Sequence, residues 1–407
     1  MPLACNPFKI LVIGDEPSDF ICPVFKKLSA RYKLDVNLLE FRKNKKEILI
    51  KEAFNKSIDL KTKIGLIDVF HSFYNPHFYF DFVKHFNFKL AIRAAFTAKK
   101  VKPIFTQHDV FNFHLLTANT LKYLEFIPKS KKIVLSFWGS DLLDPSPQFN
   151  PESIRRAVQR ADSITLHSIE MREIFLSKYG RHLFDKVHIL LVVEDTEMLE
   201  KIVSKIPEKE RIIVKFKEKY NIPSNHKIVT IGHSGHDIDN HLVVLKSFAL
   251  LKEAAKKEIT LVLPMTYGCK ELNYFEEIKM VCKKNHLNCL ILDTFLTEDE
   301  IIELRIVSEI HVRTPKFDAF SLALCETFCA DNIIITGAWL PYSRLRFSGA
   351  YFCEIDFYEK LTPLIEKVLL NFRENQRRHA GNHKKIIQMF KDENCSEKFY
   401  KALTFNN

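Results

Sequence analysis

The chain has 407 residues, of which 46% are hydrophobic and 27% are charged, and its net charge is +11. The length predicts two domains of ordinary size, and the composition is typical of a globular protein and excludes a disordered chain. Only 10 residues are glycine, which excludes a long glycine-rich loop, and no apolar run predicts a membrane-spanning helix. The positive charge favours anionic partners, unless it merely reflects genome base composition.

The N-terminus and the cysteines favour the cytosol. The segment MPLACNPFKILVIGDE has no basic start and its apolar run ends in acidic residues, so it predicts a first strand and not a secretory signal. The nine cysteines are scattered and form no C-x-x-C pair, as expected in a reducing compartment. We therefore expect a cytoplasmic protein.

In the first half of the chain, short apolar runs alternate with amphipathic stretches. Strands are predicted at residues 8–13, 35–41, 64–70, 132–137 and 163–166. Helices are predicted at residues 22–31 and 169–179, with Ser168 as the N-cap of the second. This alternation predicts a parallel sheet with crossover helices.

The alternation restarts after a charged, turn-rich stretch at residues 200–225. Strands are predicted at 227–231, 259–263, 288–292, 309–313 and 332–336, and helices at 241–255, 271–284, 298–307 and 321–330. We expect an N-terminal domain over residues 1–215, a second domain over 216–365, and helices over 366–407.

The segment TPKFDAFSLALCETFCADNIIITGAWLP, residues 314–341, carries the most chemistry. Asp318 precedes a predicted helix and Glu326 lies within it. Because helix N-termini bind anions, a diphosphate is predicted on the backbone of Ala319, Phe320, Ser321 and Leu322. The two acids would then serve different parts of one elongated ligand. The alternative is that Asp318 only caps the helix and Glu326 faces solvent.

This segment resembles the E-x-F-G-L-x-x-x-E-A-x-A-x-G-x-P-V-I motif of retaining GT-B glycosyltransferases, here D-A-F-S-L-A-L-C-E-T-F-C-A-D-N-I-I-I. The resemblance implies catalytic roles for both acids: Asp318 near the transferred sugar and Glu326 on the nucleotide ribose. It also implies retention of anomeric configuration. The first acid is Asp and not Glu, and Ser321 and Asp331 replace glycines of the family.

Further segments follow in the order of the family. SFWGSDLL resembles its h-G-x-D-L loop, which implies an acceptor-site role for Asp141. IGHSGHDIDNHLVVL and LVLPMTYGCKELNYFEEI look like segments of the N-acetylfucosaminyl (4-acetamido-4,6-dideoxygalactose) transferases of enterobacterial common antigen. Those enzymes use a dTDP-sugar and a polyprenyl-diphosphate-linked acceptor, and the resemblance covers residues 64–345.

The loop GHSGHDIDNH departs from the family, whose members place an Arg and a Lys after this strand to hold the diphosphate. The candidate donors in the loop are Ser234, the backbone of Gly235, Asn240 and His241. A loop or cap role is the alternative for His241 and for His233. The candidate cations elsewhere are Lys270, Arg313 and Lys316.

Histidines mark the ends of N-terminal elements. His71 ends a predicted strand that points at the ligand edge of a doubly wound sheet, so we choose it over His77 and His108 as a contact of sugar or acceptor. None of these three histidines belongs to a His-x-x-x-His helix or has a cysteine partner, so we expect no metal site, and no cofactor besides the nucleotide-sugar substrate.

A basic stretch at residues 82–103 holds six Lys/Arg and no acid. On a helix Lys89, Arg93 and Lys100 share one face, with phenylalanines beside them, which is typical of a membrane-surface helix. We expect peripheral contact with the anionic inner face of the membrane, with a solvated helix packed on its sheet as the alternative. No nucleic-acid-binding motif accompanies the charge, so no nucleic-acid partner is expected.

Together these patterns predict an α/β protein of the GT-B fold, with two Rossmann-like domains facing across a cleft and a C-terminal helix crossing back. The predicted activity is transfer of a hexose or amino sugar from a nucleoside diphosphate sugar to a cell-surface polysaccharide or lipid-linked oligosaccharide precursor. Two alternatives stay open: a sugar-nucleotide epimerase on the same fold, and a non-catalytic GT-B subunit that supports a partner transferase.

Overall fold

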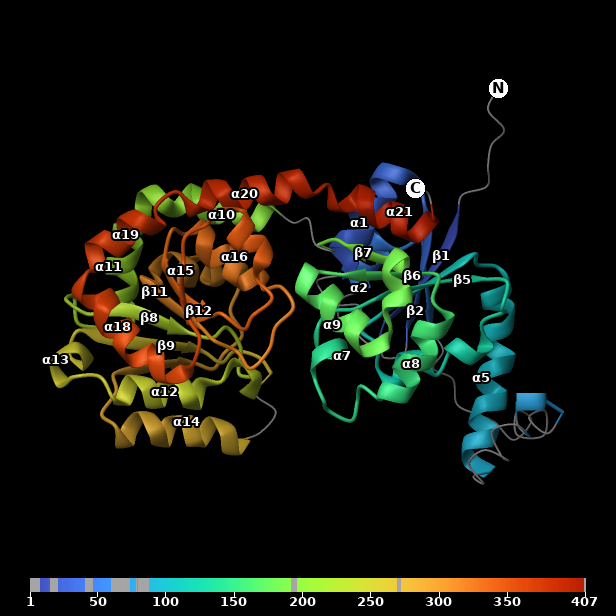
Figure 1. Cartoon of the computed structure of the whole chain (residues 1–407), viewed down its shortest axis with the longest axis horizontal. Helices are drawn as coiled ribbons and strands as arrows, with labels where there is room; N and C mark the ends of the chain where they lie inside the picture. Colours follow the sequence, from blue (N-terminus) through green and yellow to red (C-terminus); the bar gives the residue numbers. More distant parts are fainter. Residues whose placement is uncertain are drawn as a thin grey trace. The chain divides into compact units, whose positions relative to one another are not determined.

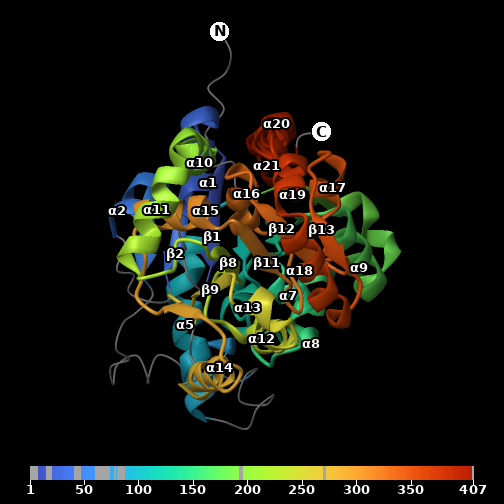
Figure 2. The same ribbon diagram turned by 90° about the vertical axis from the view of Figure 1, so that its left-hand side faces the viewer.

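A computed structural model describes residues 8–14, 21–40, 47–59, 74–77, 79, 88–191, 196–268 and 272–405. The chain forms two compact units, each with its own sheet (Figures 1 and 2). Unit 1 is Met1–Glu194 with Asn394–Asn407, and unit 2 is Asp195–Glu393. No helix among the described residues is both long and apolar enough to cross a bilayer.

Unit 1 contains a parallel sheet with the strand order β3-β2-β1-β4-β5-β6-β7 in the described part of the chain. Its strands are β1 (Lys9–Gly14), β2 (Asp35–Glu40), β3 (Lys56–Asp59), β4 (Val110–His114), β5 (Lys132–Ser136), β6 (Ser163–Leu166) and β7 (Val187–Ile189). Ile10 pairs with Val36 on one side and with Val110 on the other, so β1 is central and the strand order reverses beside it.

Helices cover the sheet of unit 1. They are α1 (Ile21–Tyr32), α2 (Glu47–Ala53), α5 (Phe88–Thr106), α6 (Ala118–Leu121), α7 (Ser140–Leu143), α8 (Pro151–Arg160), α9 (Ile169–Tyr179) and α21 (Cys395–Thr404). Phe25 of α1 and Phe399 of α21 pack on each other and close one apolar core over β1, β2 and β4. On α5, Phe105 packs edge-on against Phe111 of β4.

Unit 2 contains a second parallel sheet, with the described strands in the order β10-β9-β8-β11-β12-β13. These strands are β8 (Lys227–Ile231), β9 (Ile259–Pro264), β10 (Cys289–Leu292), β11 (Ile310–Arg313), β12 (Ile333–Gly337) and β13 (Cys353–Ile355). The order is that of the doubly wound nucleotide-binding fold, in which the direction reverses between β8 and β11.

Both faces of this sheet are covered by helices, as Figures 1 and 2 show. One layer holds α10 (Glu197–Lys205), α11 (Lys209–Lys219), α15 (Glu298–Val307) and α16 (Leu322–Cys329), and the other holds α12 (His241–Ala249), α14 (Leu272–Lys284) and α18 (Leu361–Leu370). The remaining helices of the unit are α13 (Glu253–Lys256), α17 (Ser343–Phe347), α19 (Phe372–His379) and α20 (Asn382–Glu393).

The units differ from the domain ranges expected from sequence. Residues 195–215 belong to unit 2 and not to the N-terminal domain, because α10 packs on α15 and α16 and Lys209 donates hydrogen bonds to the carbonyl of Ala330 and to Asn332. The terminal segment is also shorter than expected: α20 packs on α16 within unit 2, and only residues from 394 onward, including α21, return to unit 1.

The expected strand at residues 64–70 lies outside the described residues. Strand β4 was not anticipated from the sequence, although it lies at the centre of its sheet.

Candidate functional site

The candidate site lies at the carboxyl ends of β8 and β11 in unit 2. In a doubly wound sheet, ligands bind where the strand order reverses, and here that point lies between these two strands. Two loops meet there, residues 232–240 after β8 and residues 314–321 after β11. Lys316 joins them, because its N–H donates to the carbonyl of Ile238 at 2.9 Å.

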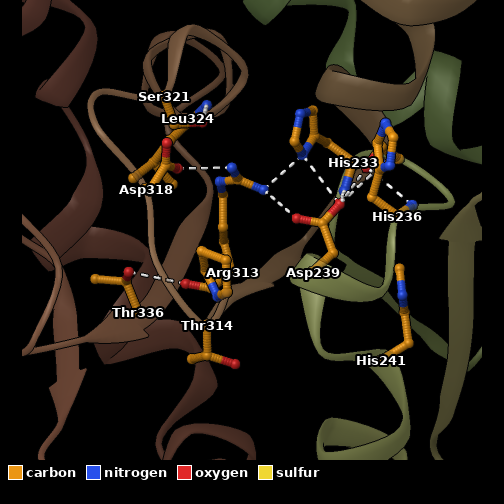
Figure 3. A network of polar contacts seen from close by, with 12 residues as sticks. His233, His236, Asp239, His241, Arg313, Thr314, Asp318, Ser321, Leu324 and Thr336 are labelled. Carbon is orange, nitrogen blue, oxygen red and sulfur yellow. Dashed lines mark hydrogen bonds and ion pairs between the residues drawn. The ribbon is translucent and has the colours of Figure 1, made fainter. Parts of the chain in front are cut away.

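Arg313, the last residue of β11, is the centre of a buried charge network (Figure 3). Its side chain is 5% exposed, and its guanidinium donates to Asp239 at 2.8 Å and to Asp318 at 2.7 Å. Burial lowers the pKa of Arg313, but the two carboxylates raise it well above its ordinary value. A buried cation with two anionic partners stays charged and ties the two loops together.

Asp239 organises the loop after β8. Its Oδ2 accepts from the Ser234 hydroxyl at 2.7 Å and from the backbone N–H groups of Ser234 and His233. Burial alone would raise the pKa of Asp239, but His233 and Arg313 lower it well below its ordinary value. Ser234, a predicted ligand donor, is therefore occupied by Asp239, and the predicted backbone donor at Gly235 bonds to the carbonyl of Tyr267 at 2.6 Å.

His233 also faces Arg313. Its Nδ1 lies 2.5 Å from the Arg313 guanidinium and 3.2 Å from Oδ2 of Asp239, so this ring nitrogen is part of the charge network. The ring is 23% exposed. Because both of these contacts are made by Nδ1, the other ring nitrogen, Nε2, is the one that could bind a ligand.

Helix α12 begins at His241, the predicted start of a helix, and Asn240 precedes it. Asn240 adopts a left-handed conformation with φ of 61°, which lets the chain turn from the loop into the helix. His241 is fully buried, and its Nδ1 lies 3.1 Å from the Tyr274 hydroxyl. Its Nε2 has no hydrogen-bond partner among the described residues. Burial lowers the pKa of His241 to about 4, so the ring is neutral near pH 7.

Asp318 is fixed on three sides. Its Oδ2 accepts from Arg313 and from the buried Tyr342 hydroxyl, each at 2.7 Å, and its Oδ1 accepts from the N–H of Ala319 at 2.8 Å. The carboxylate is nevertheless 16% exposed. Asp318 is therefore an anchored anion at the edge of the site, and Tyr342 was not singled out from the sequence.

The start of α16 offers backbone donors close to Asp318. Ser321 caps the helix by accepting from the N–H of Leu324 at 3.1 Å. Within the described part of the chain, the N–H groups of Leu322 and Ala323 have no partner, and such groups at a helix start bind anions. The side chain of Phe320 packs on Phe390.

Glu326 lies on α16 and is 18% exposed. Its Oε2 accepts from Nε of Arg305 on α15 at 2.9 Å, and the Arg305 side chain is 8% exposed. Glu326 is therefore oriented by a buried arginine and does not simply face solvent. Arg305 was not recognised from the sequence, because it is one charge on a helix whose exposed face is also charged.

Lys316 is the cation of the site with the most exposure. Its Nζ lies 2.7 Å from a carboxylate oxygen of Asp237, and the two side chains are 50% and 66% exposed. Lys270 and His71 lie outside the described residues. His77 packs against Phe126, and His108 is a buried contact of Asn37.

A second polar cluster lies at the carboxyl ends of β4 and β5 in unit 1. Asp141 is 2% exposed and accepts from the backbone N–H groups of Leu116, Trp138 and Gly139. Burial raises the pKa of Asp141 to about 6. In this structure Asp141 joins two loops.

In the same unit, His114 of β4 links its strand to the loop that carries Trp138. Its Nδ1 accepts from the Trp138 indole at 3.1 Å, and Nε2 pairs with Oδ1 of Asn112. Burial lowers the pKa of His114 to about 3, so this ring is neutral too.

Comparisons with known proteins identify the fold. No protein-family model and no curated protein matches the chain. Among solved structures, a glycosyltransferase from Rickettsia africae is similar with a TM-score of 0.70 at 14% identity, covering 99% of this chain and 100% of that one. Anabaena Alr3699/HepE in complex with UDP and glucose is similar with a TM-score of 0.69 at 13% identity, covering 98% and 100%.

Sucrose-phosphate synthase from Thermosynechococcus elongatus is similar with a TM-score of 0.65 at 10% identity, covering 99% of this chain and 100% of that one. At such identities the likeness establishes the fold alone. With its two doubly wound parallel sheets, the chain has the GT-B fold of two Rossmann-like domains, as predicted from the sequence.

Proposed function

We propose that the protein is a glycosyltransferase that uses a nucleoside diphosphate sugar as donor. The observation that carries this proposal is the geometry between β8 and β11, where unpartnered N–H groups of α16 lie between an anchored Asp318 and an oriented Glu326. The fold supports it as well, since one solved structure with this fold is a complex with UDP and glucose.

The proposed donor lies along the start of α16. Its diphosphate accepts from the N–H groups of Leu322 and Ala323, and the positive end of the helix stabilises the charge of the leaving group. Arg313 is already balanced by two carboxylates, so the additional positive charge comes from Lys316. The His233 ring contributes a hydrogen bond through Nε2.

The two acids have different roles in this proposal. Glu326, oriented by Arg305, accepts hydrogen bonds from the ribose hydroxyls, and Asp318 lies at the sugar end. We further propose retention of anomeric configuration, from the resemblance of the two acids to the E-x7-E motif. No metal ion takes part in this scheme.

A thermal-shift screen of UDP-, GDP-, dTDP- and CMP-sugars tests the donor assignment. A donor present at 100 times its dissociation constant stabilises the folded state by about 2.7 kcal/mol, and we expect one nucleotide class to do so. Glu326→Ala should abolish the stabilisation. The matched control is Glu303→Ala, which removes a carboxylate of α15 that faces Lys219. This variant should keep the stabilisation by the donor. Failure of every nucleotide sugar to stabilise the wild type would contradict the proposed function.

Product analysis separates the transferase from its alternatives. A transferase releases nucleoside diphosphate when donor and acceptor are mixed, and slowly when water replaces the acceptor. An epimerase would return an isomerised nucleotide sugar without acceptor, and a non-catalytic subunit would bind the donor without any turnover.

The acceptor that we propose is a cell-surface polysaccharide or lipid-linked oligosaccharide precursor, reached by peripheral contact with the membrane through α5. Lys99 and Lys102 of α5 are exposed, whereas Ala95, Val101 and Phe105 are buried. Co-sedimentation with anionic vesicles tests this part, because Lys89→Glu/Arg93→Glu/Lys100→Glu should weaken the binding and high salt should abolish it. Vesicle binding that is unaffected by the triple substitution and by high salt would exclude α5 as the membrane contact.

A further inference from the structure

We propose that Trp339 is a stacking surface for a pyranose ring, adjacent to Asp318. The proposal rests on the proposed function, since it assigns a sugar contact within the same site. Trp339 lies in the loop between β12 and α17, and its side chain is 38% exposed. Neither the motifs nor the fold comparisons pointed to this residue.

The loop that carries Trp339 is fastened to the loop that carries Asp318. The indole N–H of Trp339 donates to the carbonyl of Pro315 at 3.0 Å. Three residues further on, the Tyr342 hydroxyl donates to Asp318 at 2.7 Å. The two contacts run along the same segment, residues 315–318, so the indole lies beside the proposed sugar end of the site.

The indole is held in one orientation by its surroundings. Its six-membered ring lies against Gly337, where an added Cβ would come within 2.5 Å of two ring atoms. Tyr358 packs against it with ring centroids 5.1 Å apart. The Tyr358 hydroxyl in turn donates to the carbonyl of Thr314 at 2.9 Å. A glycine is therefore required at position 337 for the ring to fold back over the end of β12.

The backbone around Trp339 is also clamped. Arg346 donates to the carbonyls of Ala338 and Leu340, on both sides of Trp339, and forms an ion pair with Glu354. Loop and ring are thus preorganised, and a rigid aromatic binds with little loss of conformational entropy.

This arrangement fits a sugar. The polar atom of the indole is satisfied within the protein, so the exposed part of the ring is apolar, and its loop is bonded to the segment that carries Asp318. The C–H groups on one face of a pyranose carry partial positive charge and match the negative face of an aromatic ring, while the hydroxyls at the sugar's edge bond to carboxylates. The pyranose that stacks on Trp339 can belong to the donor sugar or to the acceptor glycan.

The chain has two tryptophans, Trp138 and Trp339, which makes a direct readout possible. Protein labelled with 5-fluorotryptophan gives two ¹⁹F resonances, and Trp339→Phe assigns them. The probes are the nucleotide sugar that stabilises the protein in the thermal-shift screen, the matching nucleoside diphosphate, and methyl α-glucopyranoside added to the diphosphate-saturated protein.

We expect the Trp339 resonance to move with the nucleotide sugar and not with the diphosphate, which assigns the ring to the donor. Movement only on addition of the methyl glycoside also supports stacking and assigns it to the acceptor. A Trp339 resonance that responds to neither sugar, or equally to the diphosphate alone, overturns the proposal. The proposed function stands in that case, because it fails only when no nucleotide sugar binds.

Calorimetry provides the second arm. If the ring belongs to the donor, Trp339→Ala should weaken binding of the nucleotide sugar on the order of tenfold and leave diphosphate binding unchanged, as expected for loss of one aromatic contact. Trp339→Phe should recover part of the affinity because it keeps an aromatic face. Phe347→Ala removes an aromatic side chain on α17 that is 77% exposed, and this control should change neither affinity. An equal loss for sugar and diphosphate in Trp339→Ala would contradict stacking on the sugar.

Discussion

The carboxyl edges of the two sheets are held together by different kinds of polar contact. In unit 1 the cluster around His114 consists of neutral hydrogen bonds, and Asp141 is enclosed by backbone N–H groups. In unit 2 a buried Arg313 links two aspartates on two loops. The same sheet topology therefore presents an internally satisfied edge in one unit and a charged, partly exposed edge in the other.

The comparison teaches where ligand chemistry can occur. An enclosed carboxylate such as Asp141 has its lone pairs occupied and serves the fold. Asp318 and Glu326 keep 16% and 18% of their side chains exposed while arginines orient them. Anchoring without enclosure is the condition for a preorganised binding group, because the group need not be reoriented when the ligand arrives.

Replacing Arg313 should have the largest effect. Arg313→Met leaves the buried Asp239 and the partly buried Asp318 without their cation, and breaking such a network costs roughly 3–5 kcal/mol of unfolding free energy. Hydrogen exchange should show lost protection in residues 232–240 and 314–321, with residues 112–141 of unit 1 unchanged.

The matched variant in unit 1 is His114→Leu, which leaves the neutral side chains of Asn112 and Trp138 without this hydrogen-bond partner. We expect it to lower the unfolding free energy by about 1–3 kcal/mol. Arg313→Lys, which keeps the charge without the two-sided fork, should fall between wild type and Arg313→Met. An unfolding free energy of Arg313→Met equal to that of the wild type would show that the ion pairs do not hold the loops.

Much of the fold could be predicted because alternating apolar runs determine the parallel sheets. Strand β4 escaped prediction because Asn112 and His114 interrupt its apolar pattern, and their partners, Ser136 and Trp138, come from a strand and loop further along the chain. The boundary near residue 195 was missed for a similar reason: the charges of α10 indicate a linker, whereas Lys201 pairs with Glu298 of α15.

The candidate site was predictable only where a motif spans a few residues. Asp318 and Glu326 stand eight positions apart, so one short motif contains both acids. Asp239 is 74 residues from Arg313, and Tyr342 is 24 residues from Asp318, so their roles follow from the fold. The sequence could suggest Arg313 as a cation but not that two acids neutralise it.

Asp318→Asn should have the next largest effect. We expect turnover to fall on the order of 100-fold while nucleotide affinity changes little, because the carboxylate acts at the sugar end. Asn keeps an acceptor for the N–H of Ala319, and Tyr342→Phe, which removes one hydrogen bond and keeps the charge, is the control. Turnover that drops only a few-fold would make Asp318 an anchor of Arg313 alone.

Acid should affect the two edges differently. The folded-state pKa values of His241 and His114, about 4 and about 3, lie below the unfolded value of about 6.5. The unfolded chain therefore gains protons first as the pH falls, so the stability present above pH 6.5 is lost toward pH 4. Between pH 7 and pH 5, each of these histidines lowers the unfolding free energy by roughly 2 kcal/mol.

In unit 1, Asp141 acts in the opposite direction. Its folded-state pKa of about 6 lies above the unfolded value, so the folded state gains the proton first and recovers about 1 kcal/mol over the same interval. Urea unfolding at pH 7 and pH 5 should show a smaller pH effect in His241→Gln and a larger one in Asp141→Asn. A pH effect identical to the wild type in both variants would refute this assignment.

Lys316→Gln should have the smallest effect on stability. Lys316 is an exposed charge proposed to bind the donor, whereas Arg313 is a buried charge that holds two loops together. Its pair with Asp237 is 50% and 66% exposed, and exposed pairs contribute about 0–1 kcal/mol. We therefore expect an unfolding free energy close to that of the wild type, in contrast to Arg313→Met. Donor affinity should nevertheless fall a few-fold and depend less on salt, because the variant lacks one screened contact with the diphosphate.

Lys279→Gln, which removes a similarly exposed lysine paired with Glu276 on α14, is the control and should leave both affinity and its salt dependence unchanged. Equal salt dependence of donor binding in wild type and Lys316→Gln would place the diphosphate away from Lys316 and leave the N–H groups of α16 as its principal partners.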